Sequence, residues 1–488
     1  MAERVDAVVV GAGPNGLAAA LVLAESGRQV VVVEAAPTVG GGSRTAELTL
    51  PGFQHDVCSA VHPMAVASPF FRAFDLSAHG VEMLQPEAAY AHPLDGARAG
   101  IAWRDLNRTA AELGEDGQAW RGLLGPLALH WEQLADLLLS DFRSIPRNLV
   151  TPLRLLRRVV EQGSPAWNLR FRSDVAPALL TGVAAHAIAP VPGLAPAGAG
   201  LWLASLGHAV GWPIPRGGSQ RIVDAVANRI RQRGGEIRTG EQVTALSQLP
   251  NANCVLLDLT PRGLLGIAGE QLPSAYRGWL ERFRYGNAVC KVDFALSDSV
   301  PWAAEGCRSA GTVHVGGSRG DIAASEQQVR DGLHPERPYV LVSQPGVVDD
   351  TRAPRGQQTL WTYAHVPRGS TVDMGDAVAA QLERFAPGFR DVVLQRSVVT
   401  AAQHEAYNAN YVGGDISAGA TTPWQLVMRP APRWDPYRTP IDGVYLCSSS
   451  TPPGPAVHGM AGVHAAGRAL RHVFGDSRRP LDLVASGR

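Results

Sequence analysis

The N-terminal 34 residues constrain the fold most strongly, because they have the order of a complete strand–turn–helix–strand unit. An apolar strand is expected over residues 5–10, and the turn GAGPNG follows at residues 11–16. An alanine-rich helix is expected over residues 17–25, and a second strand over residues 29–33 ends at an acid, Glu34. This order and spacing predict a Rossmann-type βαβ unit at the start of an α/β fold.

Each glycine of the turn has a physical task in such a unit. Gly11 permits the tight turn, Gly13 lets the backbone approach a pyrophosphate, and Gly16 allows helix and strand to pack closely. The helix N-terminus near Pro14 and Asn15 offers free N–H groups and a partial positive charge to phosphates. We therefore expect these five residues to bind an adenine dinucleotide.

The residues after the second strand favour FAD over a nicotinamide cofactor. Glu34 is placed to accept hydrogen bonds from ribose hydroxyls, and Ala35 follows it in the same site. A second glycine-rich turn, GGGSRT at residues 40–45, ends in an arginine that can pair with phosphate or support the flavin edge. Simple nicotinamide dehydrogenases do not need a turn of this kind after the acid. We therefore expect FAD to contact Gly41, Gly42, Ser43 and Arg44.

The composition is that of a globular protein without an obvious macromolecular partner. The 488 residues suffice for two domains, and 45% apolar with 18% charged residues is an ordinary balance. The net charge is zero, so no nucleic-acid partner is expected. The five cysteines are scattered without a CxxC pair, and no metal site or disulfide framework is expected. The first strand follows the initial Met almost directly, which predicts no signal peptide and a cytoplasmic protein. The oligomeric state stays open.

One segment raises the question of a membrane. Residues 175–215 contain no Asp, Glu, Lys or Arg, but several prolines and glycines interrupt them. Two short apolar helices are expected, at about residues 175–188 and 197–210, and they could form a buried cap or a surface that dips into a bilayer to collect a lipid. The preceding segment, residues 153–160, carries three arginines among leucines and valines. It suits an interfacial helix or a solvated one, so peripheral membrane contact remains an alternative.

The rest of the chain divides by pattern. Residues 100–210 are mainly helical, with the clearest helix at residues 120–139. At residues 215–219 the chain returns to the nucleotide-binding part, with a helix followed by strands at 236–239, 243–246 and 255–259, and Val243 is expected near the adenine. Alternating patterns at 288–296, 339–343 and 359–365 predict a separate sheet. The predicted units are a discontinuous FAD domain at 1–100, 211–285 and 430–488, a helical cap at 101–210, and a sheet-containing substrate domain at 286–429.

The C-terminal segment has the same order of strand, small-residue loop and helix start as the N-terminal unit. A buried strand at residues 444–447 leads into the small-residue loop SSSTPPG, and a glycine-rich helix start follows at residues 457–462. Such a loop suits the ribityl chain and the pyrimidine carbonyl of a flavin. We expect the loop contacts from Ser449 and Pro453, and backbone N–H groups at Met460 and Ala461 to stabilise charge at the flavin N1–C2 carbonyl.

Together these motifs resemble the phytoene desaturase-related FAD oxidoreductases, in the superfamily that includes amine oxidases. The resemblance covers nearly the whole chain and also rests on PGF at 51–53, HP at 62–63, WTYAHVP at 361–367 and the segments at 215–219, 408–415 and 439–462. It implies an α/β fold with a Rossmann-type FAD-binding domain of the GR2-like type and an α+β substrate domain. It also implies oxidation by hydride removal from C–C or C–N bonds.

The single lysine of the chain, Lys291, is a candidate catalytic residue. The sequence has 43 arginines and one lysine, which suggests that an ammonium is required at this place. In amine oxidase relatives a lysine on a similar strand holds a water near flavin N5 and assists the reaction with oxygen. The resemblance gives Lys291 that role, although the alignment is offset by about one residue. The alternative is a chance survivor that pairs with an acid.

Two histidines are candidate acid–base groups near the flavin. His62 follows the second glycine-rich turn, and His458 stands beside the C-terminal loop. Histidine is the side chain whose ordinary pKa lies closest to neutral pH, and it serves often as a general acid or base. For each of them, a purely hydrogen-bonded role in a polar loop is the alternative.

Three functions remain compatible with the sequence. The first is an FAD-dependent oxidoreductase of the phytoene dehydrogenase type, acting on a hydrophobic, isoprenoid- or lipid-like substrate, with the flavin reoxidised by oxygen or a quinone. The second is an amine oxidase-like enzyme, but Gly459 stands where those relatives often have a cage tyrosine. The third is an FAD-binding protein with a redox-neutral, isomerase or structural role. Only one complete dinucleotide fingerprint is present, so electrons are expected from the substrate.

Overall fold

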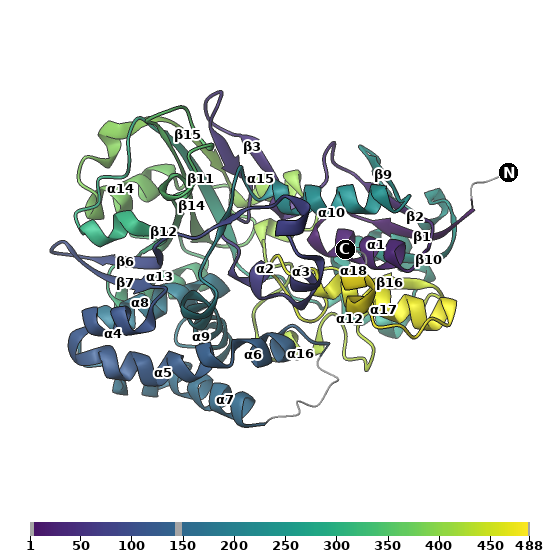
Figure 1. The fold of residues 1–488 in the computed structure, drawn as a ribbon, viewed down its shortest axis with the longest axis horizontal. Coiled ribbons are helices and arrows are strands. Elements are labelled where there is room, and N and C mark those ends of the chain that lie inside the picture. Colours follow the sequence, from purple (N-terminus) through teal and green to yellow (C-terminus); the bar gives the residue numbers. More distant parts are fainter. Residues whose placement is uncertain (1–3, 142–148, 487–488) are drawn as a thin grey trace.

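The computed structural model describes residues 4–141 and 149–486, which form two sheet-centred parts and a helical cap. Figure 1 shows a small sheet on the right, a larger sheet on the left, and the cap helices below the larger sheet. The small sheet is a parallel Rossmann-like core, and the larger sheet is mostly antiparallel. The predicted fold class, α/β with a Rossmann-type domain and a second sheet-containing domain, is confirmed.

The small sheet gathers strands from distant parts of the chain. Its order is β16-β10-β1-β2-β9, and every pairing in it is parallel. Helices cover both of its faces, so its central strands are runs of buried valines and leucines rather than alternating patterns. The strands are β1 Arg4–Val10, β2 Val30–Glu34, β9 Glu236–Thr239, β10 Asn251–Leu257 and β16 Val444–Leu446.

Two groups of helices cover the small sheet. On one face α1 packs against α10 and α17, and on the other face α11 and α12 bury leucines and a tyrosine. The bounds are α1 Pro14–Glu25, α10 Gln220–Gln232, α11 Pro261–Ala268, α12 Ser274–Glu281 and α17 Met460–Phe474. Helix α1 begins three residues earlier than predicted, because Pro14 is accommodated at the first helical turn after the cap residue Gly13.

One predicted strand of this part is wrong. Residues 241–245 have no regular structure and lead into a single 3-10 turn at Leu246–Gln248, so no strand covers residues 243–246. The Gln248 side chain accepts a hydrogen bond from the Thr244 backbone N–H at 2.7 Å, which closes this segment on itself. The strand predicted at 255–259 exists as β10, shifted toward the N-terminus.

The larger sheet has seven strands in the order β15-β11-β14-β13-β12-β6-β7. All pairings are antiparallel except that of β12 with β6. β6 and the first residues of β7 fall within residues 1–100, which were grouped with the nucleotide-binding part, yet both strands pair within this sheet. The strands are β6 Ala88–Leu94, β7 Arg98–Trp103, β11 Ala288–Leu296, β12 Ala310–Val315, β13 Val340–Ser343, β14 Gln358–Val366 and β15 Val393–Val399.

The helical cap lies on the larger sheet. The expected helix at 120–139 is two helices, because the chain breaks at His130, whose backbone is not helical. The uncharged segment forms α8 and α9, and most of its side chains are buried, as the cap interpretation predicts. The helices are α4 Leu106–Glu112, α5 Gly117–Leu129, α6 Trp131–Leu138, α7 Val150–Gln162, α8 Val175–Ala184 and α9 Leu194–Ala209.

No helix within residues 4–141 and 149–486 is both long enough and apolar enough to cross a membrane.

Short elements connect the two sheets and the cap. The connecting elements are β3 Thr45–Glu47, β4 Gln54–Asp56, α2 Pro63–Ala67, α3 Pro69–Phe74, β5 Met83–Leu84, β8 Ile214–Pro215, α13 Arg319–Arg330, α14 Gly375–Phe385, α15 Ala401–Tyr407, α16 Pro423–Met428 and α18 Pro480–Ser486.

The close contact between α1 and α17 predicts that a methyl group added at Gly462 destabilises the fold. A Cβ atom at Gly462 would lie 1.9 Å from the Asn15 backbone oxygen, so Gly462→Ala forces the two helices apart. We expect the free energy of unfolding to fall by at least about 1–3 kcal/mol, measured by thermal and chemical denaturation.

Gly122→Ala is the matched control for this prediction. Gly122 also lies within a helix, α5, but nothing stands within 4 Å of its added Cβ. Alanine there should raise stability by roughly 0.5–1 kcal/mol through helix propensity. Equal melting temperatures for Gly462→Ala and the wild type would contradict the close helix contact.

Candidate functional site

A large cavity joins the two sheets of the molecule. Its volume is about 1300 Å³, above the roughly 300–1,000 Å³ of a typical small-molecule pocket. One end reaches the glycine turn at residues 11–16, and the other end reaches the cap and the larger sheet. A cavity of this size and span can hold a dinucleotide and a second molecule together.

Most of the predicted cofactor residues line this cavity. They come from the N-terminal turn, the end of β2, the second glycine turn, the segment that leads into α2, the loop after β9 and the loop after β16, so the fold brings distant segments together. The predicted residues in the lining are Gly11, Gly13, Pro14, Asn15, Glu34, Ala35, Gly41, Gly42, Ser43, Arg44, His62, Val243, Ser449 and Pro453. Gly16, Met460 and Ala461 are buried next to it, outside the lining.

Glu34 is held in place before any ligand binds. Its Oε2 accepts a hydrogen bond from the Ala12 backbone N–H at 2.7 Å, and its Oε1 accepts one from Ala36 at 2.9 Å. The Arg44 guanidinium pairs with the same carboxylate at 3.2 Å and donates to the Thr38 carbonyl at 2.8 Å. These bonds fix the acid at the end of β2, where a ribose is expected. Arg44 is thereby placed beside the acid and the Tyr407 hydroxyl.

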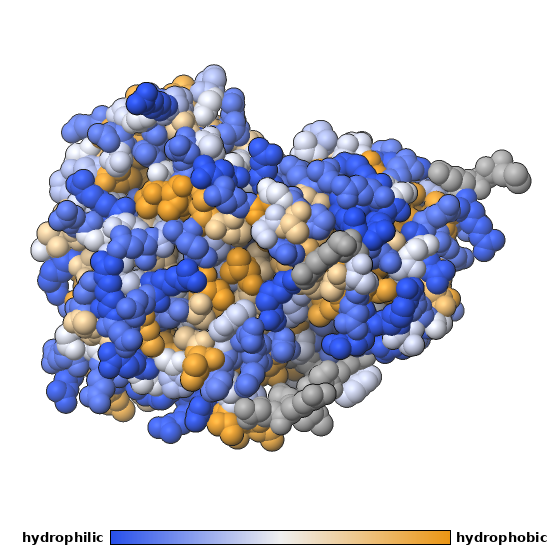
Figure 2. Space-filling view, viewed as in Figure 1, coloured by the Kyte–Doolittle hydropathy of each residue, from blue (hydrophilic) through white to orange (hydrophobic). Residues whose placement is uncertain are grey.

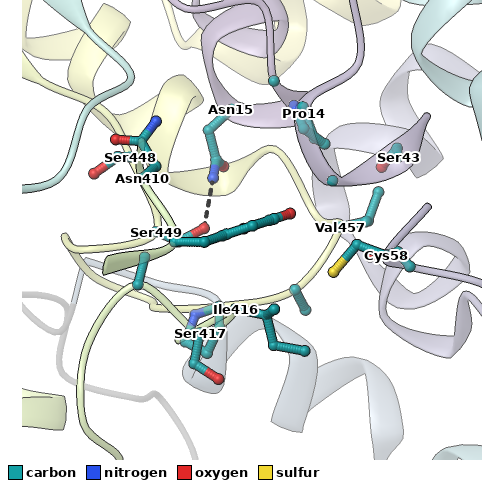
Figure 3. Close-up of a pocket in the computed structure, with 18 of the residues that line it drawn as sticks. Pro14, Asn15, Ser43, Cys58, Asn410, Ile416, Ser417, Ser448, Ser449 and Val457 are labelled. Carbon is teal, nitrogen blue, oxygen red and sulfur yellow. Dashed lines mark hydrogen bonds between the residues drawn. The ribbon is translucent and has the colours of Figure 1, made fainter. Parts of the chain in front are cut away.

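Two orphaned polar atoms show that the turn region fits a polar ligand. Asn15 donates a hydrogen bond from Nδ2 to the Ser449 Oγ at 3.3 Å, across the cavity wall (Figure 3). Asn15 Oδ1 and Ser43 Oγ are buried and have no hydrogen-bond partner among the described residues. Buried polar atoms are nearly always satisfied in folded proteins. A bound dinucleotide with its phosphates and hydroxyls would supply the missing partners.

The sequence analysis missed Asp258, which lies beneath the glycine turn. Its Oδ2 accepts a hydrogen bond from the Gly16 backbone N–H at 2.9 Å and would stand 2.8 Å from a Cβ at Gly13. Burial raises the pKa of Asp258 to about 7. The available signal was its position directly after β10, since the carboxyl ends of neighbouring parallel strands meet at one edge of the sheet.

His62 and His458 occupy different kinds of position. His62 lines the cavity, and its Nε2 lies 2.7 Å from the Ser219 Oγ, while burial lowers its pKa to about 4. His458 lies outside the lining. Its Nδ1 accepts from the Met460 N–H and its Nε2 lies 3.0 Å from the Gly454 carbonyl, so both ring nitrogens hold the C-terminal loop. These contacts make His458 a positioning residue, and acid–base roles for the two histidines stay predictions.

Lys291 also lies away from the cavity lining. It is buried on β11 and forms an ion pair with Asp293, two residues along the same strand. Its ammonium stands 5.7 Å from the centre of the Trp361 ring, and Trp361 does line the cavity. Lys291 itself borders a separate space beside Arg44 and Tyr407. The acid pairing that the sequence analysis gave as the alternative is present, and the catalytic role stays a prediction.

The far end of the cavity has no charged side chain in its described lining. Every charged residue of the described cavity lining comes from residues 1–100 or 211–285: Glu34, Arg44, Glu241, Asp258 and Arg262. Within residues 4–141 and 149–486, the cap and the larger sheet contribute only uncharged groups, among them Leu155, His186, Trp202, Thr312, Ser343, Trp361 and Tyr363. Burial lowers the pKa of His186 to about 3, so this histidine is neutral at physiological pH. This chamber suits an uncharged molecule.

Comparison with known proteins also indicates a dinucleotide-binding domain at the N-terminus. Residues 9–75 match the family described as NAD(P)-binding Rossmann-like domain. The chain is similar to mouse pyridine nucleotide-disulfide oxidoreductase domain-containing protein 2, with 26% identity over 94% of this chain and 92% of that protein. A shorter likeness, 33% identity over 18% of this chain and 16% of the other, links it to one of the subunits of limonene dehydrogenase from Castellaniella defragrans.

Solved structures show the same fold. A putrescine oxidase variant is similar with a TM-score of 0.62 at 15% identity, covering 97% of this chain and 99% of that one. Cyclohexylamine oxidase from Brevibacterium oxydans gives 0.54 at 16% identity, covering 99% of both chains. An oxidoreductase from Methanosarcina mazei gives 0.57 at 18% identity, covering 94% of this chain and 98% of that one.

These findings define the class of the protein. Residues 9–75 match the NAD(P)-binding Rossmann-like domain family, and the chain has the fold of the solved putrescine oxidase and cyclohexylamine oxidase structures. The fold that the resemblance implied, a Rossmann-type part beside a second, sheet-containing part, is thereby confirmed.

The buried Asp258 predicts a particular pH dependence. The folded protein holds the Asp258 proton up to about pH 7, whereas the unfolded chain releases it near 3.8. The folded state therefore binds more protons between these values, and the free energy of unfolding falls as pH rises, by up to about 1.4 kcal/mol per pH unit. Asp258→Asn keeps the acceptor for the Gly16 N–H and should remove this part of the fall. Chemical denaturation of both proteins between pH 4 and 8 measures this difference. If the free energy of unfolding had the same pH dependence in the wild type and in Asp258→Asn, the prediction would be contradicted.

The Lys291–Asp293 pair predicts a stability effect separate from catalysis. Lys291→Met leaves the buried Asp293 carboxylate with only His55 near it, at 3.4 Å, and breaking a buried ion pair typically costs about 3–5 kcal/mol. We expect a large fall in melting temperature for Lys291→Met and recovery of much of it in the double variant Lys291→Met/Asp293→Leu. Unchanged melting in the single variant would contradict a structural ion pair. The catalytic prediction has its own readout, the rate at which reduced flavin is reoxidised.

Proposed function

We propose that the protein is an FAD-dependent oxidoreductase that removes a hydride from an uncharged, hydrophobic, isoprenoid- or lipid-like substrate, with oxygen or a quinone reoxidising the flavin. The observation that carries this proposal is the cavity. It begins at a dinucleotide turn and ends in a chamber whose described lining has no charged side chain. Desaturation and other oxidations are both compatible with this chemistry.

The residues present at the nucleotide end fit FAD. Glu34 and Ala35 would hold the ribose of the adenosine, Gly11, Gly13 and the start of α1 the phosphates, and the second glycine turn the flavin part. Ser449 and Pro453 would contact the flavin from the C-terminal loop, which the Met460 N–H at the start of α17 holds through its hydrogen bond to His458. When bound, FAD supplies an acceptor for a hydride.

The chain contributes binding, orientation and exclusion of water. Apolar residues of the cap enclose the substrate end, including Leu155 and Val159 of α7 and Trp202 of α9. Trp361 and Tyr363 of β14 form part of the wall on the larger sheet. A dry, apolar enclosure strengthens the electrostatic interactions within it and protects a reactive centre from solvent.

The same lining disfavours the amine oxidase alternative. An ammonium group that leaves water for a buried chamber needs a carboxylate or another strong partner there. The cap and the larger sheet supply no carboxylate to the described cavity lining, and His186 is neutral. An apolar substrate requires no such partner. The third alternative, a redox-neutral or structural role for FAD, is separated from this proposal by experiment.

We also propose that this cytoplasmic protein contacts a membrane surface through α7. One face of α7 exposes Leu153, Leu156 and Val160, at 61%, 58% and 51%, next to exposed arginines. The opposite face sends Leu155 and Val159 into the cavity lining. Apolar side chains gather at the lower edge of the molecule in Figure 2, where α7 lies in Figure 1. Leucines with arginines suit an anionic bilayer, from which a lipid-like substrate could pass along α7.

An anaerobic absorption spectrum tests the redox proposal. Purified protein should show the yellow flavin band, and a hydrophobic substrate from a carotenoid and polyisoprenoid panel in detergent should bleach it. Amines should leave the band unchanged. A band that no hydrophobic compound bleaches would favour the redox-neutral or amine alternative. A colourless protein that cannot be reconstituted with FAD would overturn the proposal altogether.

Vesicle sedimentation tests the membrane surface. We expect Leu153→Ser/Leu156→Ser to lower binding to vesicles of phosphatidylcholine and phosphatidylglycerol several-fold, because less apolar area enters the interface. Leu394→Ser on β15 is the control, since it removes an exposed leucine from the larger sheet. Equal loss in both variants, or no binding by the wild type, would contradict the proposed surface.

A further inference from the structure

We propose that the substrate carries an uncharged oxygen group, and that a row of polar side chains across the larger sheet receives this group. The inference rests on the proposed function, because it concerns the substrate end of the same cavity. It adds the chemical class of the substrate: an apolar molecule with a hydroxyl, ether or carbonyl oxygen rather than a pure hydrocarbon or an amine.

The row follows directly from strand register. Tyr90 on β6 pairs with Thr312 on β12, Thr312 pairs with Ser343 on β13, and Ser343 pairs with Trp361 on β14. Side chains of directly paired residues lie on the same face of a sheet, with neighbouring strands about 4.8 Å apart. Four residues that are distant in the sequence therefore form one line across the sheet, called here the polar row.

Every member of the polar row has an unsatisfied polar atom. Tyr90 Oη, Thr312 Oγ1, Ser343 Oγ and Trp361 Nε1 are buried and have no hydrogen-bond partner among the described residues. The residues are 0%, 1%, 1% and 5% exposed. A buried polar group without a partner costs about 1–3 kcal/mol, so those members of the row that line the cavity point to a ligand that completes them.

Three members of the polar row face the cavity. Thr312, Ser343 and Trp361 line it, whereas Tyr90 lies at the end of the row outside the lining. The next row on the same face, His314, Leu341 and Tyr363, also reaches or borders the chamber, and His186 contacts His314 at 2.9 Å. The cap side of the described lining is largely apolar, with Leu155, Val159 and Trp202, and it also contains His186.

The chemistry of the row selects the ligand group. An indole N–H can only donate, while hydroxyls can donate or accept, so the row as a whole is completed by a hydrogen-bond acceptor. Among the described residues, no charged side chain of the cap or the larger sheet lines this end of the cavity. A carboxylate or an ammonium would therefore be buried without a counter-ion, at high cost. An uncharged oxygen is the group that satisfies the row without that cost.

Three probes with the same carbon skeleton test this inference: farnesol, farnesene and farnesylamine, each added in detergent to the FAD-loaded protein. Binding is followed by the shift of the flavin spectrum and by quenching of tryptophan fluorescence. We expect farnesol to bind about 10-fold or more tightly than either of the other two, because each neutral hydrogen bond contributes up to about a factor of ten.

The double variant Thr312→Val/Ser343→Ala removes two hydroxyls of the polar row with little change of shape. It should lower the preference for farnesol over farnesene to about 3-fold or less, and Trp361→Phe should lower it further. Thr359→Val is the matched control. Thr359 is on β14 with the same kind of buried, unpaired hydroxyl, but it lies outside the cavity lining, so the preference should persist.

The outcomes separate this inference from the proposed function. If the protein binds flavin but has equal affinity for the three probes, the polar row is not the oxygen site. The same conclusion follows if the double variant keeps the full preference for farnesol over farnesene. The same holds if the double variant slows reoxidation by a short-chain ubiquinone but leaves farnesol binding intact, since the oxygen then belongs to the oxidant. Absence of flavin overturns the proposed function instead. Melting temperature and flavin content confirm that each variant is folded.

Discussion

Parallel pairing of β1 with β10, and of β10 with β16, is the constraint on which the site depends. These pairings place the carboxyl ends of three strands at one edge of the small sheet, although the strands are separated by hundreds of residues. The glycine turn, Asp258 and the loop with Ser449 therefore meet at one place, as the hydrogen bonds Gly16–Asp258 and Asn15–Ser449 show. Ligand sites of α/β proteins form where such strand ends meet.

The two ends of the cavity differ in charge: charged side chains lie near the glycine turns, and the described lining at the cap and the larger sheet is uncharged. At the nucleotide end, ionisable groups are fixed by hydrogen bonds, as Glu34 is by two backbone N–H groups and Arg44. At the substrate end, the described lining is uncharged and its polar atoms gather on the larger sheet. One cavity can thus hold a polar cofactor at one end and an apolar molecule at the other. The first end supplies hydrogen-bond and charge partners, without which burial of a polar group is costly, and an apolar molecule needs no such partners.

Sequence reasoning succeeded where the signal was local. The glycine turn, the acid at the end of β2 and the buried strand β11 at Ala288–Leu296 could be located from neighbouring residues alone. It failed at residues 243–246, where an apolar run suggested a strand but the chain closes on Gln248. Sequence reasoning also grouped β6 and the start of β7 with the nucleotide-binding part, although both strands pair in the larger sheet, because nothing in a strand's own sequence says which sheet it joins.

The sequence by itself determined the Rossmann-like unit, since a turn with three spaced glycines between a strand and a helix carries its own geometry. It also limited Lys291 to a buried strand. Only the tertiary structure decided that Lys291 pairs with Asp293, that Asp258 lies under the turn, and that Thr312, Ser343 and Trp361 form one line. Those relations depend on the register between strands, which is set by packing of the whole sheet rather than by any one segment.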